Sequence, residues 1–327
     1  MRGSSALKHG YLVDSPAPPH NAVRRRSRSP LTPRRQAGAD SRAAAQVHPS
    51  GNKKLIVVES EGAVFDGLRH RHEQGYLPAF IGRFAWGADP SLCARIWRSV
   101  ALESRFRGEA PQVCLAAALR LLNTRYPSVR RVAVAKALET HLAARAPGTP
   151  GLDRAVSGAA ADLVADWQSM AEGLLREAGP PPVFEEASRF LARTAAECPD
   201  TDVLVLSRYP EATALNLWEM AGLGDRFLRI AGCERGDMAE YLRSALEAGY
   251  DTVPLLVIGS CRSTWIASQS ASARFYPIVP GKEAESWLRL SESPFATQPY
   301  GDFSAPRGDF PAFLEAACGD PFSAGRG

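Results

Sequence analysis

The sequence lacks any apolar run that approaches the roughly 20 residues a helix needs to cross a bilayer. Its first part also lacks the continuous apolar segment of a secretory signal peptide. We therefore expect neither membrane insertion nor secretion. The 327 residues are 45% hydrophobic and 23% charged, which is enough for one large domain or for a core with an inserted domain.

Cysteine is scarce and unpaired. The six cysteines are Cys93, Cys114, Cys198, Cys233, Cys261 and Cys318. Their spacing fits neither a zinc site nor a disulfide framework, so we expect the cytoplasm or another reducing compartment. Cys261 falls in a candidate loop and could be a reactive thiol. No histidine is near it in sequence, and a core or incidental thiol is the expectation.

Acidic residues are nearly absent from residues 1–50. This part has nine basic and two acidic residues, a formal charge of +7. Since the whole chain has a net charge of +4, the other residues together carry −3. It is rich in Pro, Ser, Arg and Ala and has few large apolar residues, which predicts a disordered tail. A solvated tail is the first interpretation. Organelle targeting by a transit peptide and weak binding of nucleic acid or an anionic surface stay open.

A buried strand followed by two carboxylates is predicted at residues 53–66. The run Leu55–Val58 is apolar throughout, as in a parallel strand covered on both faces. Glu59 and Glu61 stand at its carboxyl end, where open α/β sheets bind ligands. The two acids are therefore candidate site residues, and a solvated acidic turn explains this stretch alone equally well.

The same stretch resembles motif I of the haloacid dehalogenase superfamily of phosphatases and phosphotransferases. That motif has two aspartates one residue apart, then glycine and small or apolar residues, and Gly62 and residues 64–66 match it. Glu59 and Glu61 stand in the places of the aspartates. The resemblance implies that the roles of nucleophile and of acid and base would fall on these two glutamates.

A helical pattern fills the next hundred residues. The expected helices are Arg69–Trp86, Pro90–Arg107, Gln112–Asn123, Ser128–Ala144 and Leu152–Ala178. Asp89 is the expected N-cap of the second. In the resembled superfamily a helical cap after motif I closes over the active site, which implies such a cap at residues 69–179. Three tryptophans are expected to pack in a core, namely Trp86, Trp97 and Trp167.

Two further superfamily motifs have counterparts along the chain. The strand Val203–Leu206 ends at Ser207, which resembles the motif II hydroxyl that hydrogen-bonds the transferring phosphoryl group. A short strand is expected at Phe227–Ile230. The motif III lysine, which screens the negative charges, falls at Met238 at the start of an expected helix, and a thioether supplies no cation. Arg235 could reach inward instead, and a solvated Arg235 is just as good an expectation.

The strand Val253–Gly259 opens on Ser260 and resembles motif IV, in which aspartates bind magnesium. Ser260 stands in the place of the first aspartate, and Thr264 in about the place of the second. The segment from Phe275 onward resembles the region beyond the family's final strand. Further helices are expected at Val183–Ala196, Glu211–Ala221 and Met238–Ala248.

Phosphoryl transfer as in the resembled family needs side chains that are replaced by other residue types in this chain. Magnesium demands near-ideal octahedral oxygen geometry at about 2.0–2.1 Å. Glutamate adds a methylene, and a displacement of about 1 Å costs on the order of 100-fold in rate. Because such groups act as a unit, we predict no catalysis, no metal and no cofactor. The degenerate motif positions are Glu59, Glu61, Met238 and Ser260.

The sequence thus predicts an α/β fold, a Rossmann-like parallel sheet core with an inserted all-helical cap domain. The expected boundaries are a tail at 1–50, a core at 51–68 and 180–290, a cap at 69–179 and a C-terminal extension at 291–327. Strand-end amides, hydroxyls and cations could still bind a ligand. The predicted ligand-binding residues are Ser207, Arg208, Gly259, Ser260 and Arg262.

The leading functional hypothesis is a non-catalytic binding or assembly partner. Its partner is an unknown protein or a small ligand, with nucleic acid reached only through the basic tail. The first alternative is an active magnesium-dependent phosphohydrolase that uses Glu59 on a small phosphorylated metabolite. The second alternative is a different hydrolase that uses Ser207 or Cys261. The third is a functional basic tail for which the core is only a carrier.

Overall fold

The computed structural model describes residues 54–143, 159–236, 238–250 and 255–292. The basic tail, the C-terminal extension beyond Glu292, Cys318 and the beginning of the helix expected at Leu152–Ala178 lie outside these residues. Expectations placed on them stay predictions. Among the helices that are described, none is both long and apolar enough to cross a membrane.

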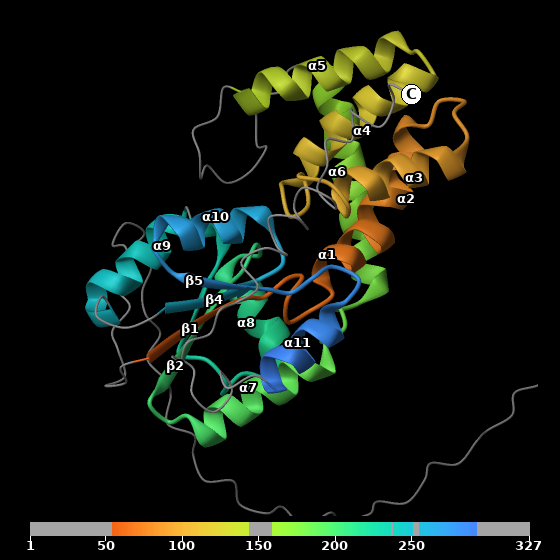
Figure 1. The fold of residues 1–327 in the computed structure, drawn as a ribbon. Coiled ribbons are helices and arrows are strands. Elements are labelled where there is room, and N and C mark those ends of the chain that lie inside the picture. Colours follow the sequence, from red (N-terminus) through yellow and green to blue (C-terminus); the bar gives the residue numbers. More distant parts are fainter. Residues whose placement is uncertain (1–53, 144–158, 237, 251–254, 293–327) are drawn as a thin grey trace, which may run out of the picture. The chain divides into compact units, whose positions relative to one another are not determined.

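One five-stranded parallel sheet has the order β3-β2-β1-β4-β5 (Figure 1). β1 (Lys54–Glu59) is central and pairs with β2 (Thr201–Leu206) and β4 (Leu255–Gly259). β3 (Arg229–Ala231) and β5 (Arg274–Pro277) form the edges. The three central strands are continuous apolar runs because both of their faces are covered. The predicted Rossmann-like parallel sheet is confirmed.

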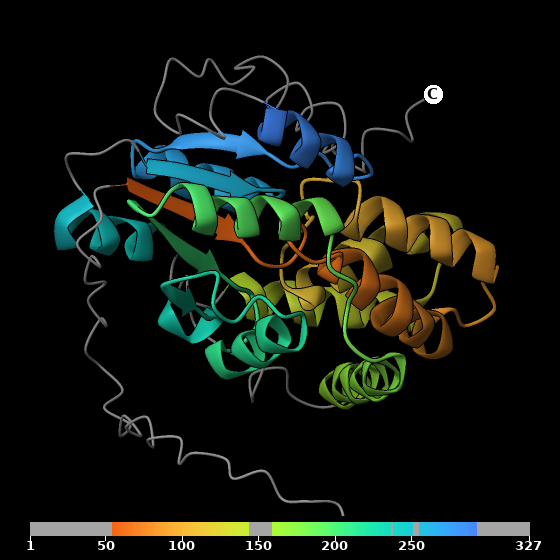
Figure 2. The ribbon, with the colours of Figure 1, turned by 90° about the horizontal axis from the view of Figure 1, so that it is seen from below.

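Successive residues of β1 face two different cores. Ile56 and Val58 pack on the face covered by α7 (Glu185–Glu197), α8 (Glu211–Met220) and α11 (Glu283–Glu292). Leu55 and Val57 pack on the face covered by α9 (Met238–Ala245) and α10 (Arg262–Ser270). Figure 1 and Figure 2 show these helices on the two sides of the sheet. The alternation follows from the period of two along a strand.

A helical insertion separates β1 from β2, and the structure describes its residues 67–143 and 159–178. It consists of α1 (Gly67–His70), a π-helical turn at Arg71–Tyr76, α2 (Leu77–Phe84), α3 (Pro90–Ala101), α4 (Pro111–Arg125), α5 (Val129–Ala143) and α6 (Ala159–Ala178). A core of its own fills it, with Phe80, Trp97, Leu119 and Trp167 fully buried. The packing role expected of Trp97 and Trp167 is confirmed. Asp89 caps α3 as predicted, accepting from the backbone N–H of Ser91 at 3.0 Å.

The chain enters and leaves the insertion at adjacent points. Phe65 forms an antiparallel bridge with Val183. The backbone N–H of Asp66 donates to the carbonyl of Pro182 at 2.9 Å, and that of Phe184 donates to the carbonyl of Val64 at 2.9 Å. Two short stretches, 64–66 and 182–184, therefore form a two-stranded stalk between the sheet and the insertion.

The helix expected at Pro90–Arg107 ends earlier, at Ala101. Ser104 breaks it, because its hydroxyl donates to the carbonyl of Val100 at 2.7 Å and accepts from the N–H of Phe106 at 3.1 Å. Residues 102–110, which we call the contact loop, follow instead. Gly108 in this loop has a φ of 79°, which the helix could not contain.

Other boundaries also differ from expectation. The segment from Phe275 was placed beyond the final strand, but it forms β5 because its backbone pairs with β4. The short strand lies at Arg229–Ala231 instead of Phe227–Ile230, and the pairing of Ile230 with Val205 fixes its register. The candidate loop around Cys261 is short, since α10 begins at Arg262. α11 was not predicted.

Candidate functional site

The carboxyl ends of β1, β2 and β4 bring Glu59, Glu61, Ser207, Arg208 and Ser260 together. Parallel strands end at a common edge, and neighbouring strands therefore place their following residues side by side. The order of strands predicted this grouping. The contacts within it were not predicted.

Glu59 is wholly buried at the end of β1. Its Oε2 accepts a hydrogen bond from the backbone N–H of Ser260 at 2.7 Å, and its Oε1 accepts one from Nη2 of Arg208 at 3.0 Å. A Cβ at Gly259 would lie 2.9 Å from Oε2, so glycine lets β4 end against the carboxylate. A buried carboxylate needs such partners to stay charged, and Arg208 supplies the opposite charge.

Glu61 is equally enclosed and is held by β2. Its Oε1 accepts from the hydroxyl of Ser207 at 2.8 Å, and its Oε2 accepts from the backbone N–H of Arg208 at 2.6 Å. Burial raises the pKa of Glu61, and hydrogen bonds from Arg208 and Ser207 oppose that rise. Ser207, predicted to contact a ligand, is thus engaged by a carboxylate of the same chain.

Arg208 joins three segments of the chain. Nη2 donates to Glu59 and, at 3.0 Å, to Oγ of Ser263, while Nη1 donates to the carbonyl of Gly108 at 2.6 Å. Burial acts to lower the pKa of Arg208, but acidic neighbours, Glu59 among them, raise it above its ordinary value. The guanidinium therefore stays charged in this partly buried position.

Several polar atoms around this cluster are buried without a hydrogen-bond partner in the part of the chain that the structure describes. They are Nε of Arg208, Nε of Arg107 and Oγ1 of Thr264. Cys261 is buried at the N-cap position of α10, and burial raises the pKa of its thiol to about 12. A thiol with that pKa is protonated at neutral pH, which argues against Cys261 as a nucleophile.

The remaining predicted residues make none of the contacts described above. Met238 is partly buried at the first residue of α9. Arg235 pairs with Glu211, with Nε donating at 2.8 Å, so the cation that meets Glu59 is Arg208 instead. Arg262 is exposed at the first residue of α10, and its role in ligand binding stays a prediction.

These residues do not fit a magnesium ion of the superfamily's kind. All four carboxylate oxygens of Glu59 and Glu61 already accept hydrogen bonds from the protein. Ser260 and Thr264 bring no charge. Among the described residues, no three His, Cys, Asp or Glu side chains are grouped so that they could hold a metal ion.

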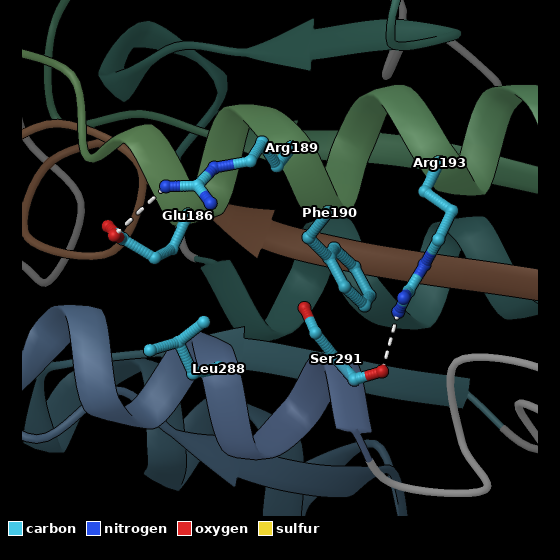
Figure 3. Close-up of a pocket in the computed structure, with 6 residues that line it drawn as sticks. All are labelled: Glu186, Arg189, Phe190, Arg193, Leu288 and Ser291. Atoms are coloured by element: carbon cyan, nitrogen blue, oxygen red, sulfur yellow. Dashed lines mark hydrogen bonds and ion pairs between the residues drawn. The ribbon is translucent and has the colours of Figure 1, made fainter.

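A surface pocket of about 300 Å³ lies elsewhere, between α7 and α11 (Figure 3). It is lined by Glu186, Arg189, Phe190, Arg193, Leu288 and Ser291. Nη2 of Arg193 donates to the carbonyl of Ser291 at 2.7 Å, and Arg189 pairs with Glu186. No pattern in the sequence predicted this pocket. Two arginines four residues apart on one helix were its only signal, since α11 itself was not predicted.

Comparisons with known proteins give similarity in fold alone. No family model and no curated protein matches the sequence. A haloacid dehalogenase-like family hydrolase from Xanthomonas campestris is 16% identical, with 70% of this chain and 85% of that chain covered and a TM-score of 0.37. One from Streptococcus pneumoniae is 10% identical, with 72% and 90% covered and a TM-score of 0.38.

A predicted phosphoglycolate phosphatase from Haemophilus somnus 129PT is 12% identical, with 68% and 84% covered and a TM-score of 0.44. Two of these three proteins are named as members of the haloacid dehalogenase-like family, which the sequence resembles. The likeness of this chain to all three is one of fold.

Proposed function

We propose that this protein is a catalytically degenerate protein with a haloacid dehalogenase-like core, and that it acts as a binding or assembly partner instead of a phosphatase. The observation that carries the proposal is the internal pairing of Glu59. The glutamate in the place of the nucleophile holds an ion pair with Arg208 and a hydrogen bond from Ser260. A carboxylate held in this way is not directed at a substrate.

The poor fit of these residues to a magnesium ion supports the same proposal. A magnesium ion would have to displace hydrogen bonds from Arg208, Ser207 and Ser260 before it reached the carboxylates. It would then find serine in the place of the motif IV acid. Neutral hydroxyls are poor replacements for carboxylates in an octahedral site.

Burial favours a macromolecular partner over a small ligand at the strand ends. Three of the five predicted ligand-binding residues, Ser207, Gly259 and Ser260, are buried. A small ligand therefore has little access to them. A partner that binds the exposed surface needs no such access.

The experiment is an assay of magnesium-dependent hydrolysis of para-nitrophenyl phosphate by the full chain. We expect the wild type to give no turnover above that of Glu59→Gln, and magnesium to produce no heat of binding in calorimetry. Glu285→Gln is the matched control, because Glu285 is an exposed glutamate paired with Arg289. Magnesium-dependent turnover that Glu59→Gln abolishes and Glu285→Gln preserves would establish the alternative, an active phosphohydrolase.

A further inference from the structure

The contact loop of the insertion lies directly against the strand ends of the core. A Cβ at Gly108 would lie 2.6 Å from Sγ of Cys261 and 2.9 Å from Nη2 of Arg208. A Cβ does not lie this close to another side chain in real proteins, so one of the two groups would have to move. The backbone of the loop is therefore in van der Waals contact with the core, and only glycine allows it.

The contact loop is also fixed within itself. The backbone N–H of Arg107 donates to the carbonyl of Ser104 at 2.9 Å, and that of Glu109 donates to the carbonyl of Phe106 at 3.0 Å. Nη1 of Arg107 donates to the carbonyl of Leu102 at 3.3 Å. These turns hold the carbonyl of Gly108 toward the core.

We propose that the core and the contact loop together form a guanidinium site, and that the chain's own Arg208 occupies it as an internal ligand. The site consists of the carboxylate of Glu59, the hydroxyl of Ser263 and the carbonyl of Gly108. When Arg208 binds in this site, it holds the insertion against the core at the strand ends. The inference deepens the proposed function and rests on it, because a site closed by Arg208 is not one that turns over substrate.

The chemistry of the site matches a guanidinium and not an ammonium. The three acceptors come from three segments and are reached by two nitrogens of one planar fork. Glu59 is buried and the side chain of Arg208 is only 16% exposed, so salt screens their attraction little. Without Arg208, Glu59 would be a buried charge with no counter-charge at this distance, and Gly108 would lose a charge-assisted hydrogen bond.

The first test removes the internal ligand and supplies it from solution. In Arg208→Ala, hydrogen exchange of the backbone amides in residues 104–110 should become about tenfold faster or more, the change expected from loss of one charge-assisted hydrogen bond. Guanidinium chloride at millimolar concentration should restore the slow exchange, and sodium chloride at equal ionic strength should not. Arg235→Ala is the control, since Arg235 pairs with Glu211 and not with Glu59. Hydrogen exchange in the contact loop of this variant should stay slow, with or without guanidinium chloride.

The second test keeps Arg208 and disturbs the loop. Gly108→Ala places a methyl group against Cys261 and Arg208, so the contact loop should exchange faster. Gly87→Ala is the matched control: its φ of 83° resembles that of Gly108, and a Cβ there meets nothing within 4 Å. Exchange is measured in the segment around the substituted glycine of each variant, so backbone strain alone accelerates it in both. This comparison also decides the matter if Arg208→Ala does not fold.

Unchanged exchange in the contact loop of Arg208→Ala, or acceleration that guanidinium does not reverse, would overturn the inference. Equal behaviour of Gly108→Ala and Gly87→Ala would do the same. Neither result bears on the phosphatase assay that tests the proposed function. Conversely, turnover by the wild type would remove the proposed function while the exchange measurements still report on the guanidinium site.

Discussion

His72 lies in the insertion where water does not reach it. It is 1% exposed, its ring lies 5.9 Å from that of Tyr76 and 5.8 Å from that of Trp97, and Nδ1 has no hydrogen-bond partner among the described residues. Burial holds the pKa of His72 well below its ordinary value, and the charges of Arg71 and Arg107 add to this. The folded protein therefore keeps this imidazole neutral.

This histidine predicts a pH dependence of stability. The unfolded chain takes up a proton at His72 below about pH 6.5 while the folded chain does not, so the stabilisation is complete above that pH and is lost as the pH falls. Between pH 7.5 and 5.5, the free energy of unfolding of the wild type, measured in urea, should fall by about 1.4 kcal/mol more than that of His72→Leu does. Burial raises the pKa of Glu61 and acts in the opposite direction, but equally in both proteins. Equal losses in the two would contradict the prediction.

The sequence predicted which residues gather at the site, but not how Arg208 is paired. Glu59, Ser207 and Ser260 follow apolar strands, and the fold class alone puts such positions at one edge. One partner of Arg208 is the carbonyl of Gly108, which lies in a loop 100 residues earlier in the chain. A contact of that kind depends on tertiary packing, which no local pattern contains.

Arg131 of α5 closes the carboxyl end of α2. Its Nε donates to the carbonyl of Phe84 and its Nη2 to that of Trp86, each at 3.1 Å, and its guanidinium also contacts the carbonyls of Ala85 and Tyr126. Three of these carbonyls, those of Phe84, Ala85 and Trp86, lie where α2 ends and leaves its last carbonyls without helical donors. Arg131 is buried, so no water replaces it.

We expect Arg131→Lys to lower the free energy of unfolding by at least about 2 kcal/mol. One ammonium cannot reach carbonyls on several sides, and each buried carbonyl left without a donor costs about 1–3 kcal/mol. Urea unfolding measures the loss. Arg120→Lys is the control: its ion pair with Glu139 is exposed, and a change within about 0.5 kcal/mol is expected. Similar losses in the two variants would show that Arg131 does not cap α2.

Elements with a strong local signal were predicted well. β1, β2 and β4 are continuous apolar runs, and Asp89 before a proline marked the start of α3. β5 was missed because four residues at a sheet edge have little periodicity of their own. The end of α3 was missed because hydrogen bonds of Ser104, invisible in the apolar pattern, determine it.

At the scale of the whole molecule, the described residues form three separate apolar cores, one in the insertion and one on each face of the sheet. The stalk and the contact loop join the insertion to the sheet. Regions with their own cores open as separate cooperative units. The insertion should therefore be able to open without the sheet.

Leu119→Ala tests this independence, because Leu119 is fully buried in the core of the insertion. The substitution should lower the free energy of opening of the insertion amides by about 2–5 kcal/mol. The amides of β1 should keep most of their protection in native-state hydrogen exchange. Val129→Ala, at a side chain that is 88% exposed on α5, should change neither. Equal loss of protection in β1 and in the insertion would show one cooperative unit.

The stalk has a consequence for protein engineering. Because Asp66 and Pro182 already touch through one backbone hydrogen bond of 2.9 Å, the two chain ends left by excising the insertion would need only a tight turn to rejoin them. Ring closure over so short a gap costs little entropy. The insertion can thus be treated as an exchangeable cassette, and a foreign helical module whose own termini lie equally close could be spliced in its place.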